Sequence, residues 1–296
     1  MSTIVPLPVL VTVALVAGVV VAWVLSRRDS GWAEVVPAPP GSVLVLDELG
    51  PLRDFAERAQ VDPALRQIWV DEVIALLRGR WYAADLWQLL AAHLRPGTPG
   101  FWPGIDLYAE AQDLVDADLR GCEIRDAGFH GTRFLGNARF DDVVFTGSVT
   151  FEQSRFEYHA FFGGTRFRRG ADFEGATFAG NTSFAGMSAG DSTRFSGARF
   201  SARTDFTGAE FAAGVSFLGA GFAGPTTFRD ARFGAEARFP DARFGSHTDF
   251  AGATAGAFRF GGARARTNVR VVRDWPEGVG LGEPQRPGHW AEVRGV

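Results

Sequence analysis

The chain has 296 residues, of which 46% are hydrophobic and 22% are charged, and its formal net charge at pH 7 is -4. This composition is sufficient for a buried core, and the small net charge indicates neither a basic nucleic-acid-binding surface nor a polyanion. The single cysteine, Cys122, excludes an intrachain disulfide and a Cys-based zinc site. The 27 Phe and 37 Gly, against 3 Tyr and 2 Met, indicate sequence repetition.

The first segment of interest is residues 4–25, a stretch of 22 residues without a charged side chain. As a helix with a rise of about 1.5 Å per residue it would extend about 33 Å, which matches the hydrocarbon thickness of a bilayer. A cleaved signal peptide is the alternative, but such peptides have a basic start and an apolar stretch of about 7–15 residues. We therefore predict an uncleaved transmembrane helix within an anchor comprising residues 1–28.

The orientation of this anchor is predicted from the two basic residues that follow it, Arg27 and Arg28. Basic residues flanking a transmembrane helix favour the cytoplasmic side. The expected protein is a single-pass membrane protein with its N-terminus outside and its C-terminal domain in the cytoplasm. Residues 29–49 follow as a Pro-rich linker that lacks a hydrophobic period.

Residues 50–111 are predicted to form a helical cap segment. We expect Asp62 to cap a helix that has Pro63 in its first turn, with a break at Gly79 and a second helix over residues 81–94. Four tryptophans in this segment suit either a membrane-interface belt or a packed cap at the end of a solenoid. The acidic residues among them favour the cap. These tryptophans are Trp69, Trp81, Trp87 and Trp102.

The decisive feature of the sequence is a Phe that recurs at every eleventh position, twelve times without interruption. This first series comprises Phe129, Phe140, Phe151, Phe162, Phe173, Phe184, Phe195, Phe206, Phe217, Phe228, Phe239 and Phe250. A second series lies five residues after each of these positions and is broken only by Ala189 and Ala255. It comprises Phe134, Phe145, Phe156, Phe167, Phe178, Phe200, Phe211, Phe222, Phe233 and Phe244. The spacing between Phe residues therefore alternates between five and six.

Neither simple strands nor amphipathic helices have this period. A right-handed coiled coil has an 11-residue period, but residues five apart lie about 140° apart on a helix, and the positions between the Phe residues are rich in Gly. Disordered Phe-Gly sequence is the other alternative, and it has no need of a fixed register. The register therefore indicates a repetitive β-structure.

The residues around each Phe carry a resemblance to a known family. Two positions before the Phe lies a small side chain, and the position directly before it is often polar, as in residues 171–173 and 204–206. Residues 117–121, Ala-Asp-Leu-Arg-Gly, resemble the consensus of the pentapeptide-repeat family: Ala, Asp or Asn, Leu or Phe, and two free positions. The similarity covers about residues 112–260.

This resemblance implies a mainly β fold, a right-handed quadrilateral β-helix in which each pentapeptide forms one side and the large residues stack inward as a core ladder. With four sides, a turn would contain 22 residues and the segment would form about seven turns. The sixth residue in every second spacing is expected to widen a corner at Gly, Asn or Pro.

Residues 261–296 are predicted to be a C-terminal cap or tail, with a last strand at residues 267–273 and a turn at Trp275. An uncovered solenoid end would expose strand edges, so either a cap or a homodimer contact is expected there.

The sequence offers no residue pattern for catalysis. The five histidines have no metal-ligand spacing, no phosphate-binding loop or nucleophile elbow occurs, and the pair Asp141 and Asp142 is a weak signal for acid–base chemistry. We expect no cofactor, no metal and no catalytic residue.

Two functions remain open. The first is a non-enzymatic, membrane-anchored scaffold that binds an unidentified protein partner, with residues 4–25 in the membrane and no nucleic-acid ligand. The second follows from the resemblance, because some pentapeptide-repeat proteins bind DNA gyrase by imitating duplex DNA. Imitation requires a strongly negative surface, whereas residues 112–265 contain 18 acidic and 17 basic side chains. The scaffold is therefore favoured.

Overall fold

The structure is a computed structural model that describes residues 11–16, 19–24, 49–80, 83–284 and 289–295. The chain divides into two compact units, residues 1–63 and 64–296, which are described separately. The first unit contains the strands β1 (Val11–Val16) and β2 (Val19–Val24) and the helix α1 (Gly50–Val61).

The transmembrane helix predicted at residues 4–25 is not found in the part of this segment that the structure describes. Strands β1 and β2 pair antiparallel there, with Val11 opposite Val24 and Val16 opposite Val19. More than half of the residues in these two strands are Val, whose β-branched side chain favours extended backbone over helix. None of the helices in the described residues has the length and apolar character needed to cross a bilayer. Arg27, Arg28 and residues 29–48 of the predicted linker lie outside the described residues.

The boundary predicted at Asp62 is also different in the structure. Asp62 is the C-cap of α1, and a short 3-10 helix, η2 (Pro63–Leu65), precedes the helix α2 (Arg66–Leu77). Asp62 therefore separates two helices, because Pro63 lacks the N–H that would continue the first one. The second predicted helix is present as α3 (Ala84–Leu94).

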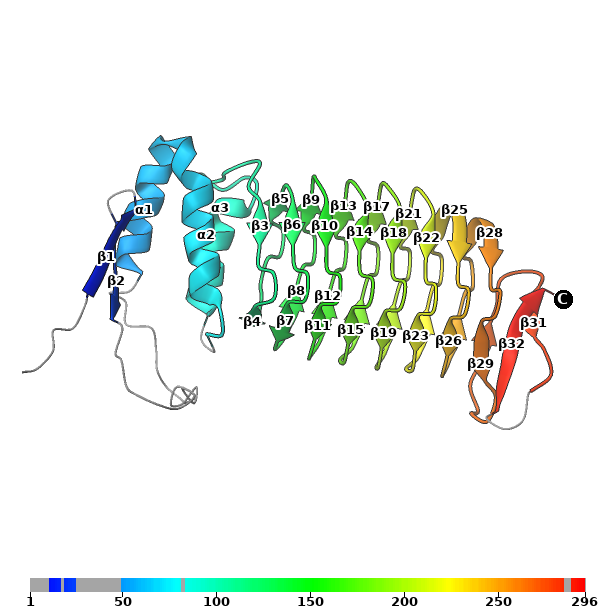
Figure 1. Cartoon of the computed structure of the whole chain (residues 1–296). Helices are drawn as coiled ribbons and strands as arrows, with labels where there is room; N and C mark the ends of the chain where they lie inside the picture. Colours follow the sequence, from blue (N-terminus) through cyan, green and yellow to red (C-terminus); the bar gives the residue numbers. More distant parts are fainter. Residues whose placement is uncertain (1–10, 17–18, 25–48, 81–82, 285–288, 296) are drawn as a thin grey trace, which may run out of the picture. The chain divides into compact units, whose positions relative to one another are not determined.

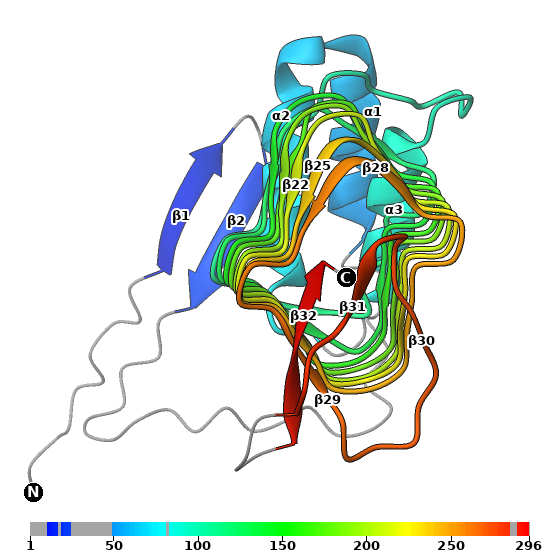
Figure 2. The ribbon, with the colours of Figure 1, turned by 90° about the vertical axis from the view of Figure 1, so that its right-hand side faces the viewer.

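The second unit contains α2, α3 and a β-solenoid of about eight turns (Figure 1). Paired residues in adjacent turns are 22 apart in sequence, as in Arg155 with Thr177 and Phe156 with Phe178. Four short strands make up one turn, and the turns superpose when viewed along the axis (Figure 2). The four-sided, 22-residue turn is the arrangement that the resemblance implies, with about eight turns rather than seven.

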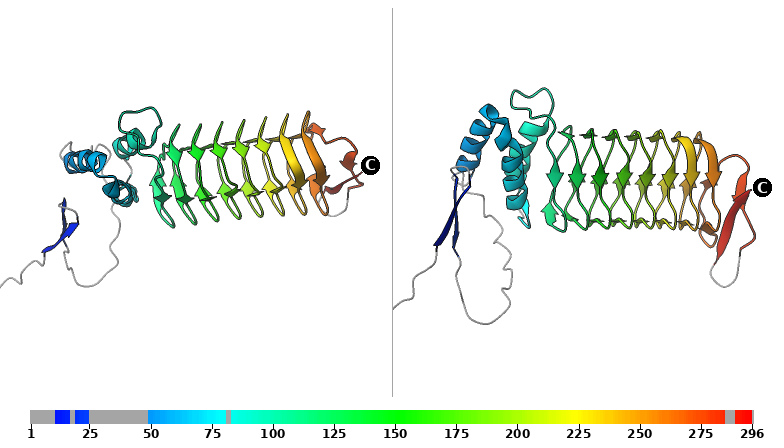
Figure 3. Two further views of the ribbon diagram at one scale, coloured as in Figure 1. Left: turned by 90° about the horizontal axis from the view of Figure 1, so that it is seen from above. Right: turned by 45° about the horizontal axis from the view of Figure 1, so that its top comes forward.

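Parallel strands from successive turns form four faces, numbered in chain order within a turn (Figure 3). The first face contains β3 (Leu107–Tyr108), β6 (Ala127–Gly128), β10 (Val149–Thr150), β14 (Ala171–Asp172), β18 (Thr193–Arg194), β22 (Val215–Ser216) and the last residues of β25 (Arg232–Arg238). The second face contains β4 (Asp113–Val115), β7 (Arg133–Leu135), β11 (Arg155–Phe156), β15 (Thr177–Phe178), β19 (Arg199–Phe200), β23 (Gly221–Phe222), β26 (Arg243–Phe244) and β29 (Arg264–Arg266).

The third face contains β8 (Ala138–Arg139), β12 (Ala160–Phe161), β16 (Thr182–Ser183), β20 (Thr204–Asp205), β24 (Thr226–Thr227), β27 (Thr248–Asp249) and β30 (Arg273–Asp274). The fourth face contains β5 (Glu123–Ile124), β9 (Val144–Phe145), β13 (Arg166–Phe167), β17 (Ser188–Ala189), β21 (Glu210–Phe211), the first residues of β25 and β28 (Thr254–Arg259).

The Phe residues of both series lie inside the solenoid and are buried. Phe184 is representative: its ring lies between those of Phe162 and Phe206, with centroids 5.0 and 4.8 Å away and interplanar angles of 10° and 7°. Phe173, which follows β14 on the opposite side of the same turn, packs edge-on against it across the core at 5.4 Å and 81°. Most rings thus combine parallel stacking between turns with edge contacts within and between turns, the two arrangements that aromatic rings prefer.

The two kinds of corner require different residues. After the first-series Phe, a tight turn places a residue at positive φ, for example Gly175 at 67° and Asp142 at 56°. Gly and Asp tolerate this conformation. At the widened corner, a Cβ on Gly224 would collide with the carbonyl group of Ala202 in the preceding turn, so the close stacking of turns requires Gly there.

The helices α2 and α3 contact the first turn of the solenoid. The buried indole of Trp87 donates from Nε1 to the carbonyl oxygen of Val115 at 2.9 Å. The side-chain amide of Gln67 pairs with the backbone of Asp106, donating to its carbonyl at 2.9 Å and accepting from its N–H at 3.0 Å. These bonds satisfy backbone groups near the N-terminal end of the solenoid.

The C-terminal end differs from the regular turns. The pairing of β25 with β28 shifts register between Phe233 and Glu236. Phe260 nevertheless stacks on Phe239 at 5.1 Å, although the spacing between these two rings is one position shorter than in the regular turns. The predicted strand at residues 267–273 is wrong, because only Arg273 of that segment lies in a strand. Strand β32 (Trp290–Gly295) instead pairs antiparallel with β29 and with β31 (Val279–Leu281).

Ala189 interrupts the Phe ladder of the fourth face, and the residue two positions before it, Met187, is buried. At the corresponding position in the two flanking turns stand Thr165 and Ala209. We infer that the flexible Met side chain fills the volume left by the missing ring. Ala189→Phe should therefore overpack the core and destabilise the protein by about 1–3 kcal/mol.

The double substitution Met187→Ala with Ala189→Phe recreates the usual pair and should recover most of this loss. Urea unfolding of both variants and of the unsubstituted protein measures the effect. A double variant as unstable as Ala189→Phe alone would contradict the compensation.

Candidate functional site

The residues that vary from turn to turn lie on the outer surface of the solenoid. In the two-residue strands that end in Phe at a buried position, the residue before it is exposed or half-buried. Because strands of one face lie in register, these outward residues form a row along each face. Any recognition by the solenoid depends on which residues share a row.

The first, third and fourth faces each carry at least one ion pair between an arginine and an acidic residue. On the first face Asp172 pairs with Arg194, on the third Arg229 pairs with Asp249 at 2.7 Å, and on the fourth Arg232 pairs with Glu210 at 2.8 Å. Each pair joins residues of neighbouring turns. In each pair the charge of the arginine is balanced by a carboxylate.

The second face is different, because its outward row is mostly basic. The arginines of this row are Arg133, Arg155, Arg199, Arg243 and Arg264. Arg133 pairs with Asp113 at 3.1 Å and lies 3.9 Å from Glu157. Within the described residues, the guanidinium groups of Arg155, Arg199 and Arg243 form no ion pair or side-chain hydrogen bond.

A hollow of about 630 Å³ lies on this face where Gly221 leaves a gap in the row. Its walls include Arg199, Arg243, Arg266 and Trp290, the last from the C-terminal strand β32. Arginine side chains around an open space favour the binding of an anionic group.

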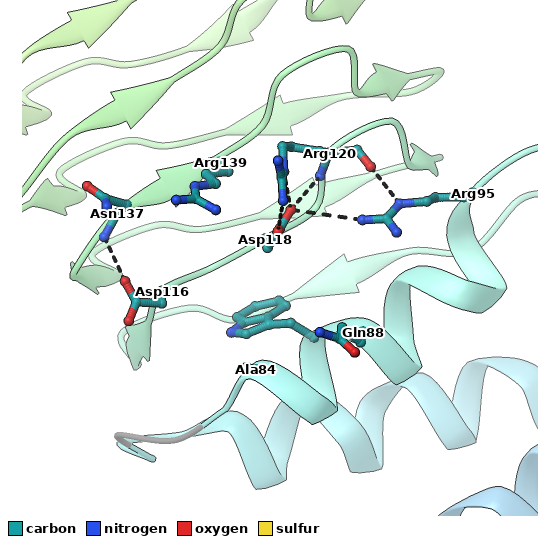
Figure 4. A pocket seen from close by; sticks show the side chains of 9 residues that line it. Ala84, Gln88, Arg95, Asp116, Asp118, Arg120, Asn137 and Arg139 are labelled. Atoms are coloured by element: carbon teal, nitrogen blue, oxygen red, sulfur yellow. Dashed lines mark hydrogen bonds and ion pairs between the residues drawn. The ribbon is translucent and has the colours of Figure 1, made fainter.

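A second hollow, of about 410 Å³, lies between α3 and the first turns of the solenoid (Figure 4). The guanidinium of Arg120 donates two hydrogen bonds to the carboxylate of Asp118, from Nε at 2.9 Å and from Nη2 at 2.6 Å. Arg95 donates from Nε to the carbonyl oxygen of Arg120 at 2.8 Å. Burial alone would raise the pKa of Asp118, but the hydrogen bonds from Arg120 and the charges of Arg120 and Arg95 outweigh it and lower the pKa.

In this second hollow, Arg95, Asp118 and Arg120 form a network of hydrogen bonds with one another. Trp87 forms one wall, and its Nε1 is already bonded to the solenoid backbone. The network therefore joins the helices to the solenoid, and the hollow has less free charge than the second face.

The residues considered for chemistry in the sequence lie apart. Cys122 is buried, and burial raises the pKa of its thiol to about 12, which makes it a poor nucleophile at neutral pH. Burial also raises the pKa of Asp141, which lies beside Asp142 at a corner. Among the described residues, no three His, Cys, Asp or Glu side chains form a group that could hold a metal ion.

The comparison with known families agrees with this geometry. Residues 116–155, 129–177 and 140–188 match the family model for pentapeptide repeats (9 copies). No curated protein matches the chain. The pentapeptide-repeat match covers the first part of the solenoid, and the same 22-residue pairing continues beyond it, for example from Phe200 to Phe222 and Phe244.

Sequence reasoning missed the basic row on the second face of the solenoid. Counting charges over the whole repeat gave a near-neutral total and hid their distribution. The signal was available, because Arg133, Arg155, Arg199 and Arg243 are separated by one or two turns of 22 residues. With the 22-residue turn that the resemblance implies and the pairing confirms, this spacing places the four arginines on one face.

His93 gives the helical cap a pH-dependent contribution to stability. Its ring stacks on Trp102 with centroids 4.0 Å apart, and Nδ1 lies 3.0 Å from the carbonyl oxygen of Gly100. Burial lowers the pKa of His93 below its ordinary value of 6.5, only partly offset by the bond to Gly100. The unfolded chain therefore binds the proton more readily, and stability is lost as the pH falls below about 6.5.

Thermal unfolding followed by Trp fluorescence at about pH 7.5 and about pH 5.5 tests this linkage. The unsubstituted protein should lose more stability on acidification than His93→Gln, whose side chain cannot take up a proton. An equal loss in both proteins would show that protonation of His93 does not affect the fold.

Proposed function

We propose that this chain is a non-enzymatic interaction scaffold whose solenoid binds a protein partner and whose uncharged N-terminal segment holds it at a membrane. The observation that carries the proposal is that nearly every side of the regular turns combines a buried Phe with a variable outward residue directly before it. Such a surface can be changed residue by residue without changing the core, as binding surfaces of solenoids require.

Membrane attachment is supported by the sequence rather than by the fold. Residues 4–25 carry no charge over 22 residues, and Arg27 and Arg28 follow after Ser26. On this proposal the solenoid lies on the cytoplasmic side.

The imitation of duplex DNA has less support as a function. A mimic needs a continuous negative potential. The outward row of the second face is basic, and acidic residues on the other faces are largely paired with arginines, as in the pairs of Asp172 and Glu210.

Site-specific photo-cross-linking of the full chain in host membranes tests the scaffold. A benzophenone residue is placed at one outward position per face, replacing Ser216, Thr177, Ser183 or Ser188 on the first to fourth faces. These four positions are half-buried and precede a core residue. A scaffold should give a discrete adduct from one face and little from the others, whereas equal adducts from all four faces, or none, would contradict it.

A parallel measurement tests the membrane attachment. Ala14→Arg places a charge within the uncharged segment and should move the protein out of the carbonate-washed membrane fraction, because a charge near the centre of an apolar span opposes insertion. Ala33→Arg adds the same charge outside that segment and should leave the protein in the membrane. Identical fractionation of both variants would contradict attachment through residues 4–25.

A further inference from the structure

Three arginines of the second face, Arg155, Arg199 and Arg243, alternate with small residues along the row. The pairing places Arg155 beside Thr177, Thr177 beside Arg199, Arg199 beside Gly221 and Gly221 beside Arg243. Neighbouring strands lie about 4.8 Å apart, so successive arginines of this row are separated by about 9.6 Å. Between them stand only small residues, which leave space above the strands.

These arginines are available for a ligand. Arg155, Arg199 and Arg243 are exposed, and within the described residues their guanidinium groups have no ion pair or side-chain hydrogen bond. A guanidinium in this state can offer two parallel N–H donors to a carboxylate. Like charges this close also repel one another, and an anionic partner would relieve that repulsion.

The hollow at Gly221 provides a space of defined shape beside these arginines. It is bounded by Arg199 and Arg243 and closed at one side by Trp290 and Arg266. Asp241, the only acidic residue among the described residues of its lining, directs its carboxylate toward the next turn, where a Cβ on Gly262 would collide with Oδ1 of Asp241. The space at Gly221 can therefore receive a side chain from a bound segment.

We propose that the second face binds an acidic, extended segment of the partner protein, running along the solenoid axis with a carboxylate at every third residue. This inference rests on the proposed scaffold function and specifies the chemistry of its partner. In polyproline II conformation the rise is about 3.1 Å, so residues three apart are about 9.3 Å apart on one side of the segment. This spacing matches the interval of about 9.6 Å between the arginines.

A β-strand fits this row less well, because its same-side residues are about 6.8 Å apart and every third residue faces the opposite side. Single-stranded nucleic acid is also disfavoured. Its binding sites combine a positive track with several aromatic platforms for the bases, whereas the described lining of the hollow contributes a single indole, Trp290. A flat anionic membrane would leave the hollow at Gly221 unused.

The test uses the full chain and a fluorescein-labelled peptide of Glu-Pro-Pro repeats, with Gln-Pro-Pro repeats as the uncharged probe. Fluorescence anisotropy measures binding. Arg199→Gln with Arg243→Gln should weaken binding of the acidic peptide by about tenfold or more, because two charge-assisted contacts are lost. The Gln-Pro-Pro peptide should bind poorly to every form.

The matched control is Arg166→Gln with Arg168→Gln on the fourth face. These two arginines are also exposed and, within the described residues, have no ion pair or side-chain hydrogen bond, so the pair of substitutions removes the same charge. This control should keep its affinity within about twofold, because long-range charge effects are screened by salt beyond about 8 Å.

Gly221→Thr tests the hollow without removing charge. A Cβ at Gly221 meets nothing within 4 Å, and Thr177 occupies the equivalent position two turns earlier, so the fold should tolerate the change. Filling the hollow should weaken binding of the acidic peptide by about threefold or more, because shape complementarity is lost.

Three results would overturn the proposal: equal weakening by both arginine pairs, no binding of the acidic peptide, or tighter arginine-dependent binding of single-stranded DNA or anionic vesicles than of the peptide. The scaffold function has a separate readout. A photo-adduct obtained from a face other than the second would retain the scaffold while rejecting this surface, and the absence of any adduct would reject the scaffold itself.

Discussion

Parallel stacking of each inward Phe on the Phe of the next turn is the contact on which the solenoid depends. It fixes the separation of the turns and their register, because rings such as Phe162, Phe184 and Phe206 stack only when the strands of successive turns are aligned. The same alignment places outward residues above one another. The basic row of the second face is thus a consequence of the core, since its arginines at positions 133, 155, 199 and 243 directly precede stacked Phe residues.

The ladder also shows how much irregularity the stacking tolerates. At Ala189 the ladder lacks a ring, and Met187 is buried two positions earlier. At the C-terminal end, the register shift between β25 and β28 shortens a corner by one residue, and Phe260 still stacks on Phe239. At the end of the third face Trp275 takes the place of a Phe and stacks on Phe250 at 5.9 Å. The rings therefore determine register, and the corners adapt to it.

The solenoid was predictable from sequence because one residue type marks nearly every side of every turn. The helices α2 and α3 were also foreseen, through Pro63 and Gly79, although the start at Asp62 was placed wrongly. The strands β1 and β2 within residues 4–25 were not foreseen, because a long uncharged stretch suits a transmembrane helix while its Val content suits strands. The basic row of the candidate site depends on which residues are neighbours between turns, and composition carries no information about that.

The most direct test of the stacking account compares two Phe residues that differ in the side of the strand they occupy. Phe161 faces outward and is half-buried on β12, whereas Phe184 is buried and directly follows β16, on the same face one turn later. In urea unfolding, Phe184→Ala should cost about 3–5 kcal/mol of stability and Phe161→Ala less than about 1 kcal/mol. Equal losses for the two substitutions would contradict the claim that the inward ladder holds the fold together.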